Sequence, residues 1–236
     1  TLFIGDSNTA ALYQYGLLPL NQVSAKVGAG VSSASTDACC YFENDEKGYT
    51  MLETIPKMKP RRVIFSFGTN DVSYRTTDEF ITEYKKVLSE AKTLYPYADI
   101  IVNAVYPIAQ KNNYPDISMG TVDAYNQALA DMCQQEGYKF LNTTEILKGE
   151  DGYLKPEYAN ADGIHLKSEA LKNVLTYVRE HAYTGTEDKR PDTDNIPDRR
   201  KSPETESNSS SVATASYHVE IVDGKSYGTL SGDGFS

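Results

Sequence analysis

The amino-acid sequence predicts an α/β protein, a three-layer α/β/α sandwich built around a five-stranded parallel sheet. Apolar runs bounded by turn residues alternate along the chain with stretches whose apolar residues recur at helical spacing. The run at residues 62–67 is almost continuously apolar, which suits a strand buried on both faces. Because strand and helix signals alternate rather than cluster, we expect a parallel sheet with helices on both sides.

Five segments carry strand signals. The first lies at the beginning of the sequence, and the second is weaker because it is less apolar. The third and fourth are rich in Val, Ile and Phe, which favour strands. We expect the strands at residues 2–5, 22–27, 62–67, 99–105 and 138–141.

Three segments carry helical signals between and after these strands. Thr77 or Asp78 is a suitable N-cap for the first helix, and Pro96 lies just beyond its end. Gly137 supplies the stop for the second helix. We expect the helices to run from residue 77 or 78 to about 94, from 121 to 136 and from 167 to 183.

The composition is that of a globular protein and argues against several classes. Hydrophobic residues make up 39% of the 236 residues, yet no stretch of 18 or more is apolar, so no membrane span is expected. The formal net charge of −10 argues against nucleic acids and anionic membranes as partners. Three cysteines, two of them adjacent, are not a disulfide framework, and three scattered histidines do not suggest zinc.

The character of the chain changes after residue 183. Residues 184–216 are rich in Pro, Ser and charged side chains and carry almost no apolar ones, so we expect a disordered linker. The terminal segment, residues 217–236, is β-prone: residues 217–222 alternate like a strand, and Asp223-Gly224 is a hairpin turn signal. This segment is too short for a core of its own, so it is either an added strand pair or a truncated module. The predicted domain covers residues 1–183.

Polar residues with the chemistry of acyl transfer follow the predicted strands. Ser7 follows the first strand, and Asn70 follows the third. Asp162 and His165 supply a carboxylate and an imidazole three residues apart. A hydroxyl, a base, an orienting acid and a side-chain amide are the parts needed to form and stabilise a tetrahedral oxyanion. In parallel sheets such groups collect beyond the carboxyl ends of the strands, so the motifs agree with the predicted topology.

These motifs resemble those of the SGNH hydrolases, also called the GDSL esterase/lipase superfamily, over about residues 1–183. Gly5-Asp6-Ser7 is similar to the first family block, Gly68-Thr69-Asn70-Asp71 to the third and Asp162-Gly163-Ile164-His165 to the fifth. The second block is a Gly after the second strand, for which Gly28 and Gly30 are both candidates. Small polar residues follow Gly30, so we favour it.

The resemblance implies a flavodoxin-like SGNH fold and assigns a role to each block. In the family the first block carries the nucleophile, the third an amide of the oxyanion hole and the fifth the acid and base. The implied catalytic residues are Ser7, Asp162 and His165, and the implied oxyanion hole consists of Ser7, Gly30 and Asn70.

Each motif also has an ordinary explanation. A lone His is most often a solvated surface residue, and Asn70 could be a turn residue after a strand. The presence of all the blocks in order favours catalysis. Asp6 and Asp71 are expected to be structural, bonding loop amides. The pair Gly28 and Gly30 lacks the further residues of a phosphate-binding loop, so no nucleotide site is predicted.

Substrate binding is expected from the loops after the strands and from the residue beside the nucleophile. Aromatic and amide side chains there could stack on a sugar, although a Tyr-rich surface is the alternative in a chain with 18 Tyr. No long apolar lid is apparent, which disfavours a lipase for long acyl chains. The candidate substrate-binding residues are Asn8, Tyr74, Tyr106 and Tyr114.

The leading functional hypothesis is a serine esterase that removes a short acyl group, acetyl first, from a carbohydrate or similar small ester. The alternatives within the fold are an acyltransferase, a lysophospholipase or a thioesterase, and the alternative of another class is a non-catalytic carbohydrate-binding or surface module. We expect no cofactor or metal and a small-molecule ester as partner, while the oligomeric state is not predicted. The Ser- and Pro-rich stretch fits a secreted or cell-surface enzyme, with a cytoplasmic one still open.

Overall fold

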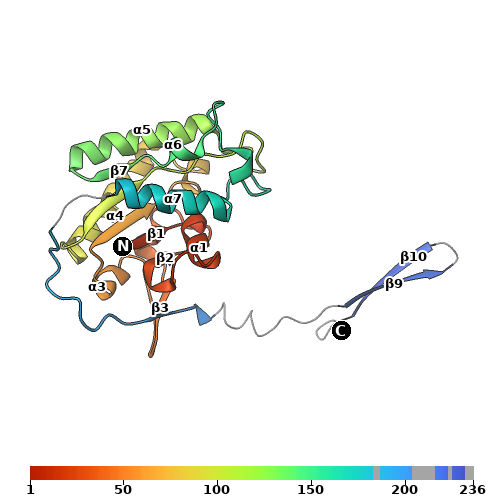
Figure 1. Cartoon of the computed structure of the whole chain (residues 1–236), viewed down its shortest axis with the longest axis horizontal. Helices are drawn as coiled ribbons and strands as arrows, with labels where there is room; N and C mark the ends of the chain where they lie inside the picture. The colour runs from red at the N-terminus through yellow and green to blue at the C-terminus, as the bar shows by residue number, and fades with distance from the viewer. Residues whose placement is uncertain (183–186, 204–215, 223–224, 232–236) are drawn as a thin grey trace. The chain divides into compact units, whose positions relative to one another are not determined.

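The structure is a computed structural model, and it describes residues 1–182, 187–203, 216–222 and 225–231. The chain divides into two compact units, Thr1–Arg200 and Lys201–Ser236. The first unit contains the parallel sheet, the long helices and all the candidate site residues named above (Figure 1).

A sheet of five parallel strands forms the centre of the first unit, in the order β2-β1-β5-β6-β7. The strands are β1 (Leu2–Gly5), β2 (Val23–Ala25), β5 (Arg62–Ser66), β6 (Asp99–Asn103) and β7 (Lys139–Leu141). The predicted fold class is confirmed. The chain runs from β1 to β2 on one side and then crosses to β5 on the other, so β1 lies where the strand order reverses. Parallel α/β sheets gather their functional groups at this position.

Helices cover both faces of the sheet, because alternate residues of each strand point to opposite sides. Leu2 and Ile4 of β1 belong to one core cluster, which includes residues of α4 (Thr77–Leu94) and α5 (Met119–Glu136). Phe3 belongs to a second cluster, with residues of α1 (Ser7–Gln14) and α7 (Ser168–His181). The near-continuous apolar character of the strands follows from burial on both faces.

Helices α4 and α5 begin slightly earlier than the sequence analysis predicted, whereas α7 begins one residue later than expected and ends at His181. The N-cap of α4 is Thr76, one residue before the expected cap, and it forms a capping box with Glu79. Helix α5 begins after Ser118 rather than at residue 121, because the Ser118 hydroxyl accepts the Thr121 N–H at 3.1 Å. It ends as predicted at Gly137, which adopts the left-handed conformation with φ of 75°.

Several short elements were not predicted, because they carry too few residues for a periodic signal. The most consequential is α1, which begins at Ser7 itself. An antiparallel hairpin, β3 (Cys40–Phe42) with β4 (Asp45–Tyr49), follows β2. The other short helices are η1 (Leu20–Gln22), α2 (Ser33–Thr36), α3 (Thr54–Met58), η2 (Asp71–Ser73), α6 (Thr144–Leu147) and η3 (Pro156–Tyr158).

The first unit extends to Arg200, which corrects the expected boundary at residue 183. Within the expected linker, β8 (Arg199–Arg200) pairs with β3. The Arg199 side chain is buried and donates to the Ser24 hydroxyl at 2.7 Å, the Val23 carbonyl and the Tyr41 carbonyl. The linker hypothesis was based on the scarcity of apolar residues. It is wrong for residues 187–200, which we call the strap. Hydrogen bonds from side chains such as Arg199, rather than apolar burial, hold the strap against β2 and β3.

The second unit contains an antiparallel pair of strands, β9 (Ser216–Val222) and β10 (Lys225–Ser231). The strand signal at residues 217–222 is therefore confirmed, whereas the predicted turn at residues 223–224 lies outside the described residues. Residues 204–215 of the expected linker also lie outside them.

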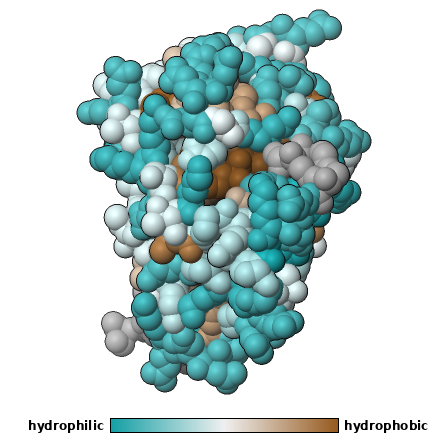
Figure 2. Space-filling view, turned by 90° about the vertical axis from the view of Figure 1, so that its left-hand side faces the viewer, coloured by the Kyte–Doolittle hydropathy of each residue, from teal (hydrophilic) through white to brown (hydrophobic). Residues whose placement is uncertain are grey.

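The surface in Figure 2 is predominantly hydrophilic, with one hydrophobic hollow near the centre of the face shown. In the described part of the chain, no helix is both long enough and apolar enough to cross a membrane.

The strap leads to a first prediction. Replacing Arg199 with Ala leaves three buried or half-buried acceptors without their donor, so the free energy of unfolding should fall by about 2–3 kcal/mol. Urea denaturation monitored by circular dichroism measures this difference. Lys172→Ala is the control, because it removes only an exposed ion pair with Glu169 and should change stability by less than about 0.5 kcal/mol. Equal stability of Arg199→Ala and the wild type would contradict a structural role of the strap.

Candidate active site

The residues of the predicted site follow the carboxyl ends of three neighbouring strands. Ser7 follows β1, Gly30 follows β2 and Asn70 follows β5. Strand β1 lies between the other two, and Gly5 at its end is in register with Ala25 on one side and Ser66 on the other.

The turn that presents Ser7 is tight. Gly5 has no room for a side chain, since a Cβ there would lie 2.3 Å from the Ser66 carbonyl oxygen and 2.2 Å from the Thr9 hydroxyl. The chain enters α1 directly, with Asp6 as N-cap accepting the Asn8 N–H at 3.0 Å. Ser7 is therefore the first residue of the helix, where backbone N–H groups have no helical partner and the helix dipole favours negative charge.

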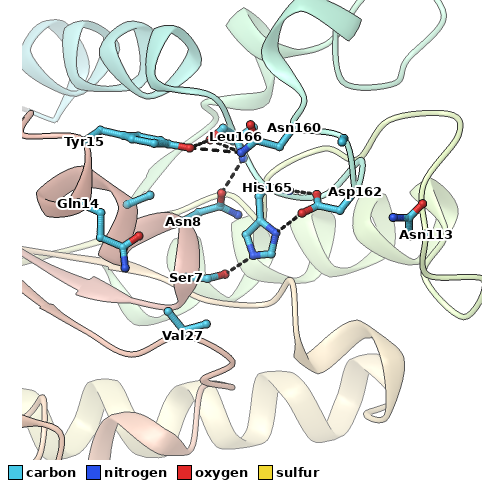
Figure 3. A pocket seen from close by; sticks show the side chains of 12 residues that line it. Ser7, Asn8, Gln14, Tyr15, Val27, Asn113, Asn160, Asp162, His165 and Leu166 are labelled. Carbon is cyan, nitrogen blue, oxygen red and sulfur yellow. Dashed lines mark hydrogen bonds and ion pairs between the residues drawn. The ribbon is translucent and has the colours of Figure 1, made fainter. Parts of the chain in front are cut away.

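Ser7, His165 and Asp162 form one hydrogen-bonded chain (Figure 3). The Ser7 hydroxyl lies 2.9 Å from Nε2 of His165, and Nδ1 of His165 lies 2.7 Å from Oδ2 of Asp162. In the tautomer with the proton on Nδ1, the ring donates to Asp162 and accepts from Ser7. This arrangement lets the imidazole take the Ser7 proton while Asp162 stabilises the resulting cation.

Asp162 is held in its ionised form by its own loop. Burial alone would raise its pKa, but the backbone N–H groups of His165 and Ile164 and the His165 ring together hold that pKa below its usual value. Both N–H groups donate to Oδ1 at 2.9 Å, which leaves Oδ2 for the imidazole. Gly163 allows the loop this shape, since its φ is +81° and a Cβ would lie 2.6 Å from the Cβ of Asn112.

Asn70 and Gly30 are linked by the segment that follows β5. The Asn70 amide donates one N–H to the Ala29 carbonyl at 3.0 Å, and an amide nitrogen carries a second N–H. The Asp71 carboxylate accepts the Val31 N–H at 3.1 Å, so Gly30 lies between two anchored residues. Arg75 completes the connection by donating to Asp71 at 3.1 Å and to the Ser32 hydroxyl at 3.0 Å.

The structure distinguishes the two candidate glycines of the second block. Gly30 is buried, and a Cβ there would lie 2.3 Å from the Tyr74 hydroxyl and 2.9 Å from Asp71. Gly28 is exposed and has φ of +76°, and a Cβ there would meet no atom within 4 Å. The position of Gly30 therefore supports the choice of Gly30, and Gly28 serves the turn.

Two buried carboxylic acids lie behind these groups. Burial raises the pKa of Asp6 to about 7, assisted by the nearby Asp71 and opposed by hydrogen bonds from Asn8 and Thr69. Burial also raises the pKa of Asp71, against the Val31 hydrogen bond and the charge of Arg75. Both carboxylates bond loop amides, which agrees with the structural role expected for them.

Two of the expected substrate-binding residues are buried. Asn8 is 1% exposed, and its amide is bonded to the backbone on either side of His165. It also borders the cleft described below, so its part in substrate binding stays a prediction. Tyr106 is 5% exposed and packs in the second core cluster, because the chain still runs through the interior directly after β6. The expectation that its side chain contacts substrate is therefore wrong.

The other two expected residues are accessible. Tyr74 is 60% exposed and donates its hydroxyl to Asp71 at 3.3 Å, beside Gly30. Tyr114 is 40% exposed, in the loop after β6. Their part in substrate binding stays a prediction.

A cleft of about 610 Å³ opens beside Ser7 and His165, within the size range of small-molecule sites. Much of its rim was not predicted. Gln14 is the last residue of α1 and Tyr15 is its C-cap, about two helical turns after Ser7, and the helical period counted from the nucleophile would have found them. Asn113 belongs to a loop that was expected to contribute. The complete lining is Ser7, Asn8, Ala11, Gln14, Tyr15, Val27, Asn113, Asn160, Ala161, Asp162, His165 and Leu166.

Comparison with known protein families agrees with this site. Residues 3–171 match the model of the GDSL-like lipase/acylhydrolase family, which is more than half of the chain. The chain therefore belongs to this family and is a serine hydrolase that acts on ester bonds. No curated protein matches the sequence.

Solved structures share the fold. A GDSL-like lipase from Bacteroides thetaiotaomicron is 17% identical, with a TM-score of 0.57 over 76% of this chain and 85% of that one. The acetylxylan esterase Axe2 from Geobacillus stearothermophilus is 20% identical, with a TM-score of 0.53 over 78% and 94%. A carbohydrate esterase of family 3 from Talaromyces cellulolyticus is 16% identical, with a TM-score of 0.53 over 75% and 92%.

The two glycines provide a second prediction. Gly30→Ala forces Tyr74 or Asp71 to move and disturbs the turn beside Ser7, so kcat/KM for an activated ester should fall by about 10- to 100-fold. Gly28→Ala is the matched control. It should cost roughly 1 kcal/mol of stability through its positive φ and leave kcat/KM close to wild type. The reverse ranking of the two kcat/KM values would point to Gly28 as the residue next to the reacting carbonyl.

The third prediction concerns Asp6 and the pH dependence of stability. A carboxyl whose pKa is raised on folding adds stability that is complete below its unfolded value and is lost as pH rises through about 7. Asp6→Asn cannot ionise and can still cap α1. Relative to wild type, its free energy of unfolding should therefore increase between pH 4.5 and pH 8, by on the order of 2–4 kcal/mol.

Urea titrations of both proteins at the two pH values measure this change. Glu90→Gln, on the exposed side of α4, is the control for the loss of a carboxylate. If the difference between Asp6→Asn and wild type were the same at both pH values, Asp6 would not titrate in this range.

Proposed function

We propose that this protein hydrolyses short acyl esters, acetyl esters first, of carbohydrates or similar small polar alcohols through an acyl-enzyme on Ser7. The observation that carries the proposal is the Ser7–His165–Asp162 chain opening into a cleft with a polar rim.

Acylation begins with transfer of the Ser7 proton to Nε2 of His165 as the Ser7 oxygen attacks the acyl carbon. The negative charge that develops on the acyl oxygen is stabilised by the backbone N–H groups of Ser7 and Gly30 and the side-chain amide of Asn70. When the tetrahedral intermediate collapses, His165 gives its proton to the leaving alcohol. The products of this half-reaction are the free alcohol and an ester between Ser7 and the acyl group.

Deacylation repeats these steps with water. His165 takes a proton from the water molecule, whose oxygen attacks the acyl carbon, and the same three N–H donors stabilise the second oxyanion. Collapse of the intermediate returns the proton from His165 to the Ser7 oxygen and releases the carboxylic acid. Asp162 stays ionised throughout, since its role is to orient the ring and stabilise the imidazolium.

The chemistry of the cleft supports a small polar alcohol. The amides of Gln14, Asn113 and Asn160 lie on its rim, and Tyr15 offers an aromatic ring that is 42% exposed. Amides bond hydroxyl groups, and an aromatic face stacks on a sugar ring. The apolar lining comes only from short or branched side chains, namely Ala11, Val27, Ala161 and Leu166.

Two of the structural neighbours have names that point to the same substrate class, an acetylxylan esterase and a carbohydrate esterase. Transfer to a sugar hydroxyl uses the same acyl-enzyme, and thioester or lysophospholipid hydrolysis uses the same groups. The cleft does not provide the extended apolar lining that a long acyl chain would need. We also propose that the enzyme is secreted or attached to the cell surface. The support for this location is the Ser- and Pro-rich composition of residues 184–216.

A chain-length series of p-nitrophenyl esters tests the proposal. A pocket that accepts methylene groups gains about 0.8 kcal/mol for each one, so a long-chain enzyme would improve steeply along the series. We expect the acetate to be hydrolysed faster than the butyrate, and the octanoate to be poor. Ser7→Ala should reduce kcat by at least about 10⁴-fold on every ester.

An acetylated xylo-oligosaccharide extends the test to the alcohol. Released acetate should be detected for the wild type, and Asn113→Ala should lose more kcat/KM on this substrate than on p-nitrophenyl acetate, because remote binding is lost while the acyl site remains. A preference for octanoate would reject the short-acyl assignment. Accumulation of an acetylated acceptor sugar instead of acetate would identify a transferase.

A further inference from the structure

Helix α1 carries the nucleophile and also holds the loop that carries the base. Asn8, the residue after Ser7, is 1% exposed and uses both ends of its amide. Its Oδ1 accepts the Leu166 N–H at 2.9 Å, and its Nδ2 donates to the Ile164 carbonyl at 3.4 Å. These two partners flank His165 in the chain. Figure 3 shows the Asn8 side chain between α1 and the loop, above the Ser7–His165 contact.

A second point of attachment is Tyr15, the C-cap residue of α1, about two helical turns after Asn8. The Tyr15 hydroxyl donates to the Leu166 carbonyl at 3.4 Å, and the Asn160 amide reaches both that carbonyl and the Tyr15 oxygen at 3.3 Å. The His165 carbonyl accepts the Asn160 N–H at 2.8 Å. The Tyr15 contact is partly exposed, whereas both Asn8 contacts are buried and the one to the Leu166 N–H is short, so Asn8 is the stronger attachment.

We call residues 160–166, which carry His165, the base loop. Its backbone groups at and beside His165 are all hydrogen-bonded. The His165 N–H is bonded to Asp162, its carbonyl to Asn160, and the neighbouring carbonyl and N–H to Asn8. The contacts to Asp162 and Asn160 lie within the loop and move with it. Those from Asn8 join the loop to the helix of the nucleophile, so they set where His165 stands relative to Ser7.

We infer that Asn8 is a positioning residue, which fixes the distance between the Ser7 oxygen and Nε2 of His165 by holding the loop to α1. This inference rests on the proposed function of Ser7 and His165. Asn8 acts through His165, so its loss should slow proton transfer and leave substrate binding largely intact. A misplacement of about 1 Å in a catalytic contact can cost on the order of 100-fold in rate.

The decisive variant is Asn8→Ala, which removes both contacts to the loop. We expect kcat on p-nitrophenyl acetate to fall by about 10- to 100-fold while KM stays close to wild type. The proton on Nδ1 of His165 should be observed by NMR in the wild type, and its resonance should shift or broaden in Asn8→Ala as the ring loses its fixed position.

Asn126→Ala is the matched control. The Asn126 amide also bonds both backbone groups of a loop residue, accepting the Val105 N–H at 2.7 Å and donating to the Val105 carbonyl at 3.0 Å. Its removal costs two similar hydrogen bonds away from the base loop. Compared at temperatures where each protein is fully folded, Asn126→Ala should keep the wild-type kcat and the His165 resonance.

Asn8→Ser provides a second variant if Asn8→Ala does not fold. It leaves a smaller gap than Ala and introduces no buried charge, but its single hydroxyl is too short to bond both Leu166 and Ile164. It should lose less kcat than a full removal, about three- to tenfold, with KM unchanged.

The outcomes separate this inference from the proposed function. If Ser7→Ala were as active as the wild type, the proposed function itself would fail. If Ser7→Ala were inactive while Asn8→Ala and Asn8→Ser kept the wild-type kcat, only the inference on Asn8 would be overturned. A rise in KM at unchanged kcat would also overturn it, because that result would place Asn8 in substrate binding.

Discussion

The position of β1 between β2 and β5 is the constraint on which the site depends. Parallel pairing on both sides brings the ends of three strands to one edge, with Gly5 in register with Ala25 and Ser66. The strand order reverses at β1, so the turns that follow these strands diverge and leave space between them. Ser7, Gly30 and Asn70 come from these three turns, and none could be moved to another strand without separating the hydroxyl from the proposed amide donors.

Ionisable groups are buried behind this edge at a cost in stability. Asp6 and Asp71 are each at most 2% exposed, and burial raises the pKa of both. Asp6 caps the helix of the nucleophile, and Asp71 holds the turn that contains Gly30. A buried carboxyl is tolerated only where it bonds several donors, so these two acids both require and enforce the shape of their turns.

Polar side chains also make the long-range connections of the first unit. Asn8 joins α1 to the loop of His165, across 158 positions in the sequence. Arg199 joins the strap to β2 and β3 in the same way, by placing its N–H groups on backbone carbonyls and a hydroxyl. In both places hydrogen bonds from polar side chains, with one buried residue at their centre, hold an irregular segment in place.

Much of the fold was predictable because its signals are local. The strands are apolar on both faces, α4 and α5 show helical spacing, and Gly137 ends a helix as expected. The strap was not predictable, because the expectation counted apolar residues and Arg199 is held by hydrogen bonds to distant carbonyls. The position of Tyr106 was not predictable either, since burial directly after a strand depends on what packs there.

By itself the sequence determined the residue types of the site and their order along an α/β chain, since strand ends and motif spacing are local properties. Only the tertiary structure decided which groups meet. It brought His165 to Ser7, buried Gly30 while leaving Gly28 exposed, and bonded the Asn8 amide to the backbone on either side of His165. The physical reason is that each of these contacts is a directional hydrogen bond or a close approach between segments far apart in the chain, set by the packing of the whole sheet.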